Sequence, residues 1–332
     1  MAEKIFVLGS NSFSGASFVD YALQEGCEVI GVSRSPEAHH VFLPYKWHNP
    51  ENLRRFRFYQ MDLNRDLEPI MELINEFKPD YVVNFAAQSM VAESWQNPEH
   101  WMMTNIVSNV RFQDRLRKSS FLNKYVHIST PEVYGSCDGL VKEGTNYNPS
   151  TPYAVSRAAC DMSLMTFFKG YKFPVVFTRA ANVYGPGQQL YRIIPRTILF
   201  FLIDRKLQLH GGGQSVRSFI HIKDVVEGTL LAMKTGIPGE IYHFSTKENI
   251  SIRALVQMIA DKLGMSFENN VEIIGERLGK DSAYLLDNMK VHQELGWDAN
   301  ISLEKGIEDT IKWVEKNMEE LQKLPFDYIH KP

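Results

Sequence analysis

Short apolar runs alternate with longer amphipathic segments through the first half of the chain. The apolar runs are rich in β-branched and aromatic residues, which predicts strands at Lys4–Leu8, Glu28–Val32, Arg57–Gln60, Tyr81–Phe85, Tyr125–Ile128 and Val175–Thr178. Helical spacing of apolar positions predicts helices at Ser14–Gln24, Leu67–Glu76, Glu99–Leu116 and Pro152–Lys169. Because strand and helix alternate strictly, we predict an α/β fold with a doubly wound parallel sheet.

The pattern changes after about residue 180. Strong turn signals stand at Tyr184–Gly187 and Gly211–Gly213. Further helices are predicted at Ile194–Ile203, Lys223–Lys234, Ile252–Leu263 and Ser302–Leu321. We assign residues 1–180 and about 215–245 to the sheet domain, and about 181–214 and 246–332 to a smaller C-terminal lobe. No repeat or flexible linker separates them, so we expect the two to pack together.

Composition narrows the class of protein. With 332 residues, 44% of them hydrophobic, the chain can bury a large core, and its net charge of −3 does not favour nucleic acid or an anionic membrane as a partner. The longest apolar run, Ile198–Ile203, is too short to span a bilayer, and the start does not resemble a signal peptide. The three cysteines and ten histidines show no disulfide or metal-ligand spacing. We therefore expect a cytoplasmic protein without a bound metal.

A glycine-containing turn follows the first predicted strand. Gly9, Ser12 and Gly15 form a Gly-x-x-Ser-x-x-Gly sequence directly before the first predicted helix. Backbone amides at such a turn suit the pyrophosphate of a dinucleotide, as in the Rossmann fold. Ser12 stands where a third glycine is usual, so an ordinary strand–helix turn is the alternative.

The end of the second predicted strand bears on the choice of cofactor. Ser33 stands where NAD-binding proteins usually carry an acid, and Arg34 follows it. No carboxylate there would repel a 2′-phosphate, and a guanidinium is available to bind one. We therefore predict NADP, with NAD as the alternative. Arg34 as a solvated surface residue is the other interpretation.

Three polar segments lie where ligands bind in such sheets. Asn84–Ser89 and His127–Gly135 follow two predicted strands, and Asn148–Arg157 opens a helix with Thr151 as the N-cap candidate and Pro152 at its first position. Tyr153 and Arg157 are four residues apart and share a helix face. A nearby cation lowers the pKa of a phenol and makes it a usable base during hydride transfer. A surface Tyr/Arg pair is the alternative.

Taken together, these motifs resemble those of the extended short-chain dehydrogenases/reductases, in the branch of nucleotide-sugar 4,6-dehydratases and epimerases. The resemblance covers nearly the whole chain, at Gly9–Gly15, Asp62–Leu63, Ala86–Ser89, Thr104–Asn105, Ser129–Gly135, Tyr153–Arg157, Asn182–Pro186, Arg217–Asp224 and Arg277–Asp281. Ser129–Gly135 is most similar to dTDP-glucose 4,6-dehydratases. Ala86–Ser89 and Ser33–Arg34 look more like GDP-mannose 4,6-dehydratases.

The resemblance implies roles for individual residues. Tyr153 would be the base at the C4 hydroxyl, Thr130 the hydrogen-bond partner of the sugar O4, Glu132 the base at C5, and Arg157 the cation beside the tyrosine. Tyr153 and Arg157 would also contact the cofactor, together with Gly9, Ser12, Phe13, Gly15, Ser33, Arg34, Asp62, Leu63, Ala86 and Ala87. The smaller lobe would bind the substrate, with contacts from Gln88, Ser89, Asn182, Arg192, Arg217 and Arg277. A homodimer packed through the helices at 99–116 and 152–169 is also implied.

Two positions depart from the family pattern. Arg157 replaces a lysine; it keeps the positive charge but cannot relay a proton. Pro131 replaces the aspartate of the dTDP-glucose branch, which removes the expected acid for the departing C6 hydroxyl. The GDP-mannose branch also lacks that aspartate, so elimination with Glu132 acting twice remains open.

We therefore predict an NAD(P)-dependent nucleotide-sugar 4,6-dehydratase. The protein would oxidise C4, eliminate water across C5–C6 and return the hydride to C6. A 4-epimerase and a UDP-glucuronate-type decarboxylase are the alternative enzymes. A cofactor-binding protein without catalysis is the alternative outside enzymes, suggested by Ser12 and Arg157. Glu132 favours the dehydratase, because an epimerase needs no base at C5.

Overall fold

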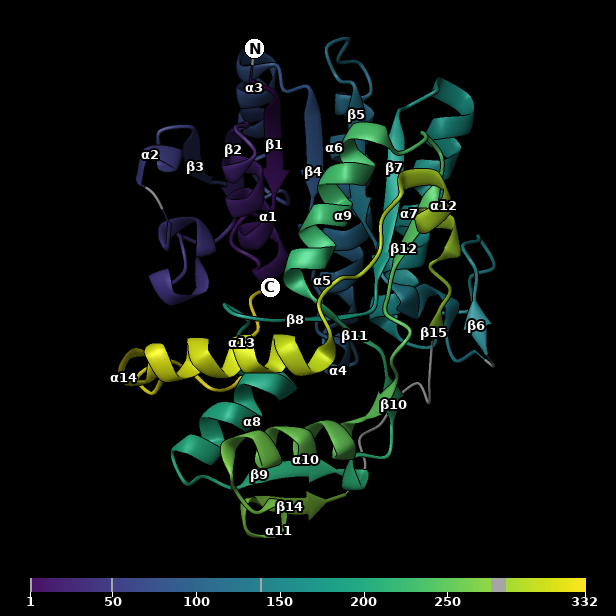
Figure 1. Cartoon of the computed structure of the whole chain (residues 1–332). Coiled ribbons are helices and arrows are strands. Elements are labelled where there is room, and N and C mark those ends of the chain that lie inside the picture. Colours follow the sequence, from purple (N-terminus) through teal and green to yellow (C-terminus); the bar gives the residue numbers. More distant parts are fainter. Residues whose placement is uncertain (1, 49, 138, 276–284) are drawn as a thin grey trace.

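A seven-stranded parallel sheet forms the centre of the computed structural model, which describes residues 2–48, 50–137, 139–275 and 285–332 (Figure 1). Its strand order is β12-β7-β5-β4-β1-β2-β3. The strands are β1 (Lys4–Leu8), β2 (Glu28–Ser33), β3 (Phe56–Gln60), β4 (Tyr81–Asn84), β5 (Lys124–Ile128), β7 (Val175–Ala180) and β12 (Ile241–Phe244). Because winding reverses between β1 and β4, the carboxyl ends of these strands mark the expected ligand site.

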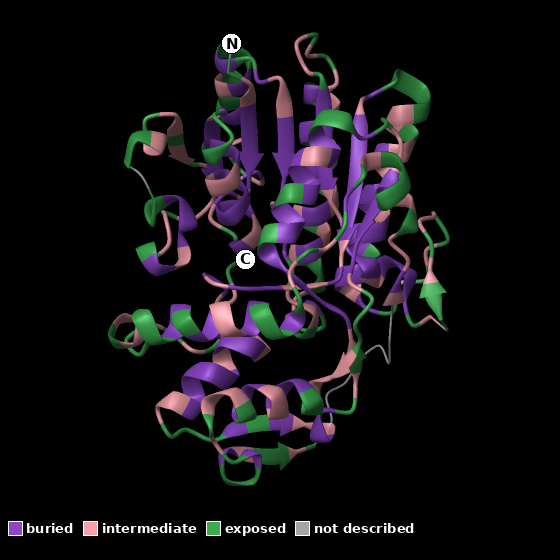
Figure 2. Ribbon diagram, in the orientation of Figure 1, coloured by how far each residue is buried: buried purple, intermediate pink, exposed green. Residues whose placement is uncertain are grey.

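Helices cover both faces of the sheet, as predicted. On one face, Ile5 and Val7 of β1 pack with α1 (Phe13–Gln24) and α9 (Ile222–Thr235). On the other, Phe6 and Leu8 belong to the core formed with α3 (Leu67–Phe77), α6 (Asn109–Leu116) and α7 (Pro152–Tyr171). This alternation along β1 is the period of two expected of a strand buried on both faces. Figure 2 shows the sheet as an almost wholly buried layer.

The helix predicted at Glu99–Leu116 is interrupted. It consists of α5 (Pro98–Met102), a π-helical segment η3 (Met103–Ser108) and α6. The π-turn directs buried Asn105 toward the loop after β4, where its side chain bonds both backbone groups of Gln88 and donates to Ser156 Oγ. The prediction of one continuous α-helix was therefore wrong. The helix widens to a π-turn here, and Asn105 in that turn bonds the backbone of the loop after β4.

The smaller lobe lies beyond the carboxyl ends of the strands (Figure 1). Its main elements are α8 (Ile193–Leu202), β9 (Leu207–His210), α10 (Ile252–Leu263), α11 (Phe267–Asn270), β14 (Val271–Ile274), α13 (Leu303–Lys316) and α14 (Met318–Leu321). Ile198, Leu255 and Ile307 join α8, α10 and α13 in one core. The helix predicted at Ser302–Leu321 is divided into α13 and α14, which are separated at Asn317.

Short elements connect and edge the two parts. They are α2 (Pro50–Leu53), α4 (Val91–Ser94), β6 (Leu140–Val141), β8 (Asn182–Tyr184), β10 (Val216–Arg217), β11 (Phe219–His221), β13 (Ile250–Ser251), β15 (Leu285–Leu286), α12 (Met289–Leu295) and the 3-10 turns η1 (His40–Phe42), η2 (Pro44–Lys46), η4 (Pro131–Tyr134) and η5 (Gly211–Gly213). Val291 and Trp297, within the range predicted for the smaller lobe, pack against Tyr242 and Phe244 near β12. In the described part of the chain, no helix has the length and apolar character needed to cross a membrane.

Candidate active site

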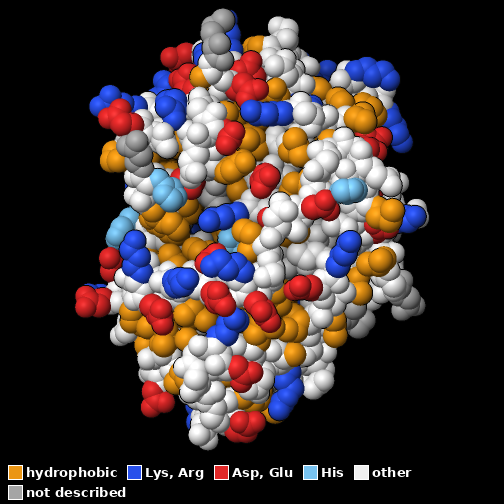
Figure 3. Space-filling model, viewed as in Figure 1, with side chains coloured by type: hydrophobic (Ala, Val, Ile, Leu, Met, Phe, Trp, Pro, Cys, Tyr) orange, Lys and Arg blue, Asp and Glu red, His pale blue; other side chains and the backbone are white. Residues whose placement is uncertain are grey.

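A cleft of about 930 Å³ lies between the carboxyl ends of the strands and the smaller lobe. Many predicted site residues line it together: Ser12, Phe13, Ala87, Ser89, Thr130, Glu132, Tyr153, Arg157, Asn182, Arg192 and Arg217. Figure 3 shows Lys and Arg side chains across the middle of this face, where the two parts of the molecule meet. The cleft thus joins residues from both halves of the sequence.

The turn after β1 packs closely against the backbone of the loop after β4. Gly9 has φ +76°, and a Cβ there would lie 2.6 Å from the Ala86 amide nitrogen. Ser12 caps α1: its Oγ accepts from the Gly15 amide (3.0 Å) and donates to the Gly9 carbonyl (2.8 Å). Ser12, Phe13 and Ser14 line the cleft, so the N-terminus of α1 faces it, which suits the pyrophosphate of a dinucleotide.

Tyr153 stands in the first turn of α7, close to the end of β5. Thr151 caps this helix by accepting from the Ala154 amide at 3.1 Å, and Pro152 occupies its first turn, as predicted. Burial raises the pKa of Tyr153, although Arg157 and a hydrogen bond with Thr130 act to lower it. Arg157 lowers the pKa of Tyr153, as predicted, but the loss of solvation on burial raises that pKa by more.

The loop that carries Thr130 and Glu132 is held from several sides. Thr130 Oγ1 accepts from the Glu132 amide at 3.3 Å and caps η4. Gly135 has φ +68°, and any Cβ there would collide with the Asn148 carbonyl. The Tyr134 hydroxyl lies 2.8 Å from His243 Nε2. Glu132 and Tyr153 line the same cleft, near enough for the Glu132 carboxylate to raise the pKa of the phenol.

Basic side chains gather in the smaller lobe's half of the cleft. Arg192 and Arg217, both expected at a diphosphate, line it together with Arg196, Arg205 and Lys206. Arg196 is paired with Asp327 at 2.8 Å. Guanidinium groups bind phosphate oxygens in bidentate fashion, so this half suits a nucleoside diphosphate. Arg277, also expected there, lies outside the described residues.

Comparison with known proteins identifies the family. A family model described as GDP-mannose 4,6 dehydratase matches residues 6–310. The chain belongs to this family. Among its relatives, human dTDP-D-glucose 4,6-dehydratase is 34% identical over 80% of this chain and 77% of that protein. A probable dTDP-glucose 4,6-dehydratase of Sinorhizobium fredii is 30% identical over 95% of this chain and 93% of its own length.

Solved structures of related enzymes share the architecture. A dTDP-glucose 4,6-dehydratase from Streptomyces venezuelae with NAD and TYD bound has a TM-score of 0.85 and 29% identity, covering 95% of this chain and 98% of that one. A UDP-glucose 4-epimerase from Thermotoga maritima with UDP-glucose also has a TM-score of 0.85, at 27% identity, covering 95% of this chain and 99% of that one. The predicted fold, family and nucleotide-sugar 4,6-dehydratase function are thereby confirmed. A nicotinamide cofactor and a nucleotide-sugar substrate are supported.

For this dehydratase, the structure adds buried partners of Arg157 and a buried ion pair that the sequence analysis missed. Arg157, only 2% exposed, donates to the Ile128 carbonyl at the end of β5 and lies 3.4 Å from His127 Nε2. One turn on, Asp161 accepts from Arg179 (2.8 Å) and from Ser129 Oγ (2.6 Å). Burial opposes ionisation of Asp161, yet Arg179 and His127 bring its pKa to about 2. These charges hold the strand end that leads into Thr130.

Several predicted cofactor residues lie beside the open cleft rather than in its lining: Gly9, Gly15, Ser33, Arg34, Asp62, Leu63 and Ala86, together with Gln88 from the predicted substrate set. Arg34 is partly exposed, and its guanidinium donates to the backbone oxygens of Lys331 (3.0 Å) and Pro332 (2.6 Å). Gln88 Nε2 also donates to the Lys331 carbonyl, at 2.7 Å. The sequence contained no local signal for these contacts.

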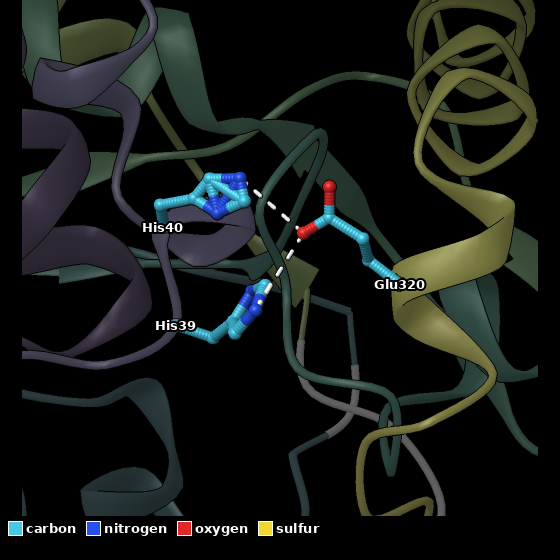
Figure 4. Close-up of side chains that lie close together, drawn as sticks. All are labelled: His39, His40 and Glu320. Atoms are coloured by element: carbon cyan, nitrogen blue, oxygen red, sulfur yellow. Dashed lines mark ion pairs between the residues drawn. The ribbon is translucent and has the colours of Figure 1, made fainter.

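His39 and His40 are exposed, and both meet Glu320 of α14 (Figure 4). The imidazole Nε2 atoms lie 3.5 and 3.3 Å from Glu320 Oε2. These three side chains carry potential metal ligands, but each is partly exposed and none lines the cleft. They take no part in the site described above.

Proposed function

We propose that the protein converts a nucleoside-diphosphate hexose into its 4-keto-6-deoxy derivative within this cleft. The observation that carries the proposal is that Tyr153, Thr130 and Glu132 line one wall of the cleft, opposite arginines that suit a diphosphate. A phenol, a hydroxyl and a carboxylate together supply the groups for the two proton abstractions, from the C4 hydroxyl and from C5, that this reaction requires.

The turn after β1 and the neighbouring strand ends would hold the cofactor. A bound nicotinamide would supply the hydride acceptor for C4 and the hydride donor for C6. Tyr153 removes the proton of the C4 hydroxyl. Thr130 fixes the orientation of the phenol, and the Arg157 charge favours the phenolate against the effect of burial.

Glu132 acts after the ketone has formed. A C4 ketone acidifies the C5 hydrogen, and a carboxylate positioned beside it can remove that proton. Pro131, buried in η4, offers no second acid, so Glu132 passes the proton on to the departing C6 oxygen. Two further acids line the cleft from the smaller lobe's side: Asp327 is paired with Arg196, and Glu272 accepts a hydrogen bond from Gln208. This supports Glu132 as the C5 base.

A panel of nucleotide sugars tests the activity. The purified protein is incubated with dTDP-, GDP- and UDP-hexoses, and the products are examined by mass spectrometry and NMR. A 4-keto-6-deoxy product supports the proposal. A C4 epimer, or loss of carbon dioxide from UDP-glucuronate, would replace it by one of the two alternative activities.

We further propose NADP as the preferred cofactor and a homodimer as the assembly. NADP is supported by Ser33 and Arg34 at the end of β2, where no acidic side chain stands in the place usual for NAD-binding proteins. NAD is the alternative, and related structures contain it. The dimer is supported by exposed apolar side chains on η3 and α7: Met103, Val107, Val155 and Met162.

A further inference from the structure

Residues 327–332, here called the strap, run from the smaller lobe to the sheet domain along the cleft. Before the strap, the Phe326 ring packs against Phe200, with centroids 5.6 Å apart. Asp327 then pairs with Arg196 at the cleft, and the Tyr328 ring meets Tyr191 edge-on at 5.3 Å. Figure 1 shows the end of the chain between β1 and α13. The strap therefore connects both walls of the cleft.

On the sheet side, a stack of rings anchors the strap. The His330 ring lies nearly parallel to those of Trp101 and His100 of α5, with centroids 5.2 and 5.1 Å away. His330 Nε2 also lies 2.8 Å from His100 Nδ1. These contacts come from α5, outside the residues assigned to the chemistry.

The strap is held on both sides of the turn expected to bind pyrophosphate. The Lys331 carbonyl accepts from Arg34, which follows β2, and from Gln88, which follows β4. In the sheet, β1 lies between these two strands, and neighbouring strands are about 4.8 Å apart. A carbonyl held from both sides consequently lies over the carboxyl end of β1, where Gly9 begins the turn.

The strap is a thin cover and not part of a packed core. Ile329, Lys331 and Pro332 are exposed, and the Lys331 ammonium holds the rim through Ser35 Oγ at 2.9 Å. Segments with few buried apolar contacts open at low free-energy cost compared with the core. The strap can therefore open without unfolding either part of the molecule.

We propose that the strap is a latch of the cofactor site, which must open for the dinucleotide to enter or leave. This inference rests on the proposed reaction, in which the hydride removed from C4 returns to C6. If the reduced cofactor leaves before that step, the keto intermediate cannot receive the hydride at C6. Slow cofactor exchange therefore benefits this chemistry, and the strap supplies it without touching the reacting carbon atoms.

The test measures cofactor release without any sugar. Protein loaded with NADH or NADPH is mixed rapidly with excess oxidised cofactor, and the loss of bound-nicotinamide fluorescence gives the release rate. A variant ending at Phe326 should release either cofactor about tenfold faster, because every strap contact is lost. His330→Ala should release it faster as well, His330→Phe should keep most of the retention, and exposed Lys323→Ala, outside the strap, should match wild type.

Release from the truncated protein and from His330→Ala within about twofold of wild type would overturn the latch. So would faster association with an unchanged release rate, which would mean that the strap competes for the cofactor site instead of closing over it. Because the assay uses no sugar and both cofactors, its result is independent of the product panel and of the NADP preference. Failure of the proposed activity and failure of the latch are therefore distinguishable.

Discussion

At the Tyr153 phenol, burial and charge act in opposite directions on the pKa. Burial raises it, and Arg157 lowers it. Removing the guanidinium in Arg157→Ala should raise this pKa further, so that the phenolate forms only at higher pH. The acidic limb of the pH–rate profile for kcat should then move upward. Arg157→Lys, which keeps the charge, should move it less; an unmoved limb in Arg157→Ala would require another activator for Tyr153.

Glu132 is predicted to act on C5 and not on C4. Glu132→Gln keeps the size of the side chain but removes the base. Hydride transfer from C4, seen as reduced cofactor, should persist, whereas exchange of the C5 hydrogen with deuterated solvent should fall by about 100-fold or more. Thr130→Ser serves as a control, because it keeps the hydroxyl that caps η4. Normal C5 exchange in Glu132→Gln would place the base elsewhere.

Arg34 should distinguish the two nicotinamide cofactors. If its guanidinium binds a 2′-phosphate, Arg34→Ala should weaken NADP binding by about tenfold or more, a change that NAD binding should not share. Titration of both cofactors against wild type and variant measures this. Because Arg34 also holds the strap, equal weakening of NAD and NADP would mean that Arg34 acts only through the strap. Tighter binding of NAD by wild type would reject the NADP preference.

In helix α7, the residues assigned to the reaction, Tyr153 and Arg157, are followed one turn later by Asp161, which belongs to a buried ion pair. Asp161 lies one turn after Arg157 and is fully buried with Arg179. Asp161→Asn leaves a buried guanidinium without its counter-ion, which should lower the free energy of unfolding by about 3 kcal/mol at pH 7. Urea denaturation measures this. Cys160→Ala, at the neighbouring buried position, is a control that changes no charge.

The same ion pair determines a pH dependence. The pKa of Asp161 is about 2, below its usual value of about 3.9 in an unfolded chain. Its contribution to stability is therefore complete above pH 4 and is lost as the pH falls toward 2. The difference in unfolding free energy between wild type and Asp161→Asn should shrink over that interval. A constant difference down to pH 2 would contradict the assignment.

Most elements of the fold could be predicted because their periodicity is local. The six predicted strands and the helices around them follow from spacing within one segment. The strand β12 was missed, since His243 interrupts the apolar character of the short segment Ile241–Phe244, although the fold buries all four residues. The π-turn was also missed, because its cause is a contact between Asn105 and the loop after β4.

The candidate site divides in the same way. Thr130, Glu132 and Tyr153 belong to short motifs and could be named from the sequence. Arg179 meets Asp161 across the fold, and Arg34 meets Lys331 across almost the whole chain. Charged residues inside apolar strands and helices, such as Arg179 in β7, were the available signal for the first pair. Residues 327–332 carried none for the second, because a short segment without helix or strand periodicity does not show which distant residues it contacts.

At the scale of the whole molecule, an apolar stripe on α7 supports self-association. Val155 and Met162 lie seven positions apart on one helix face and are exposed, near Met103 and Val107 of η3. Val155→Glu should introduce a desolvated charge into the proposed interface and shift the protein to monomers. Sedimentation velocity measures the mass. Exposed Ile237→Glu, on the loop after α9, should leave it unchanged; a monomeric wild type would reject the dimer.

The late position of β12 has a consequence for synthesis on the ribosome. β7 pairs with β5 on one side and with β12 on the other, but α8, β9 and α9 are all made before Ile241. Until then, β7 presents unpaired N–H and C=O groups, the type of edge to which other chains add. Such long-range pairing also forms slowly. A nascent chain that has not reached Phe244 therefore carries an open sheet edge. Chaperones can bind such an edge, and other chains can aggregate by pairing with it.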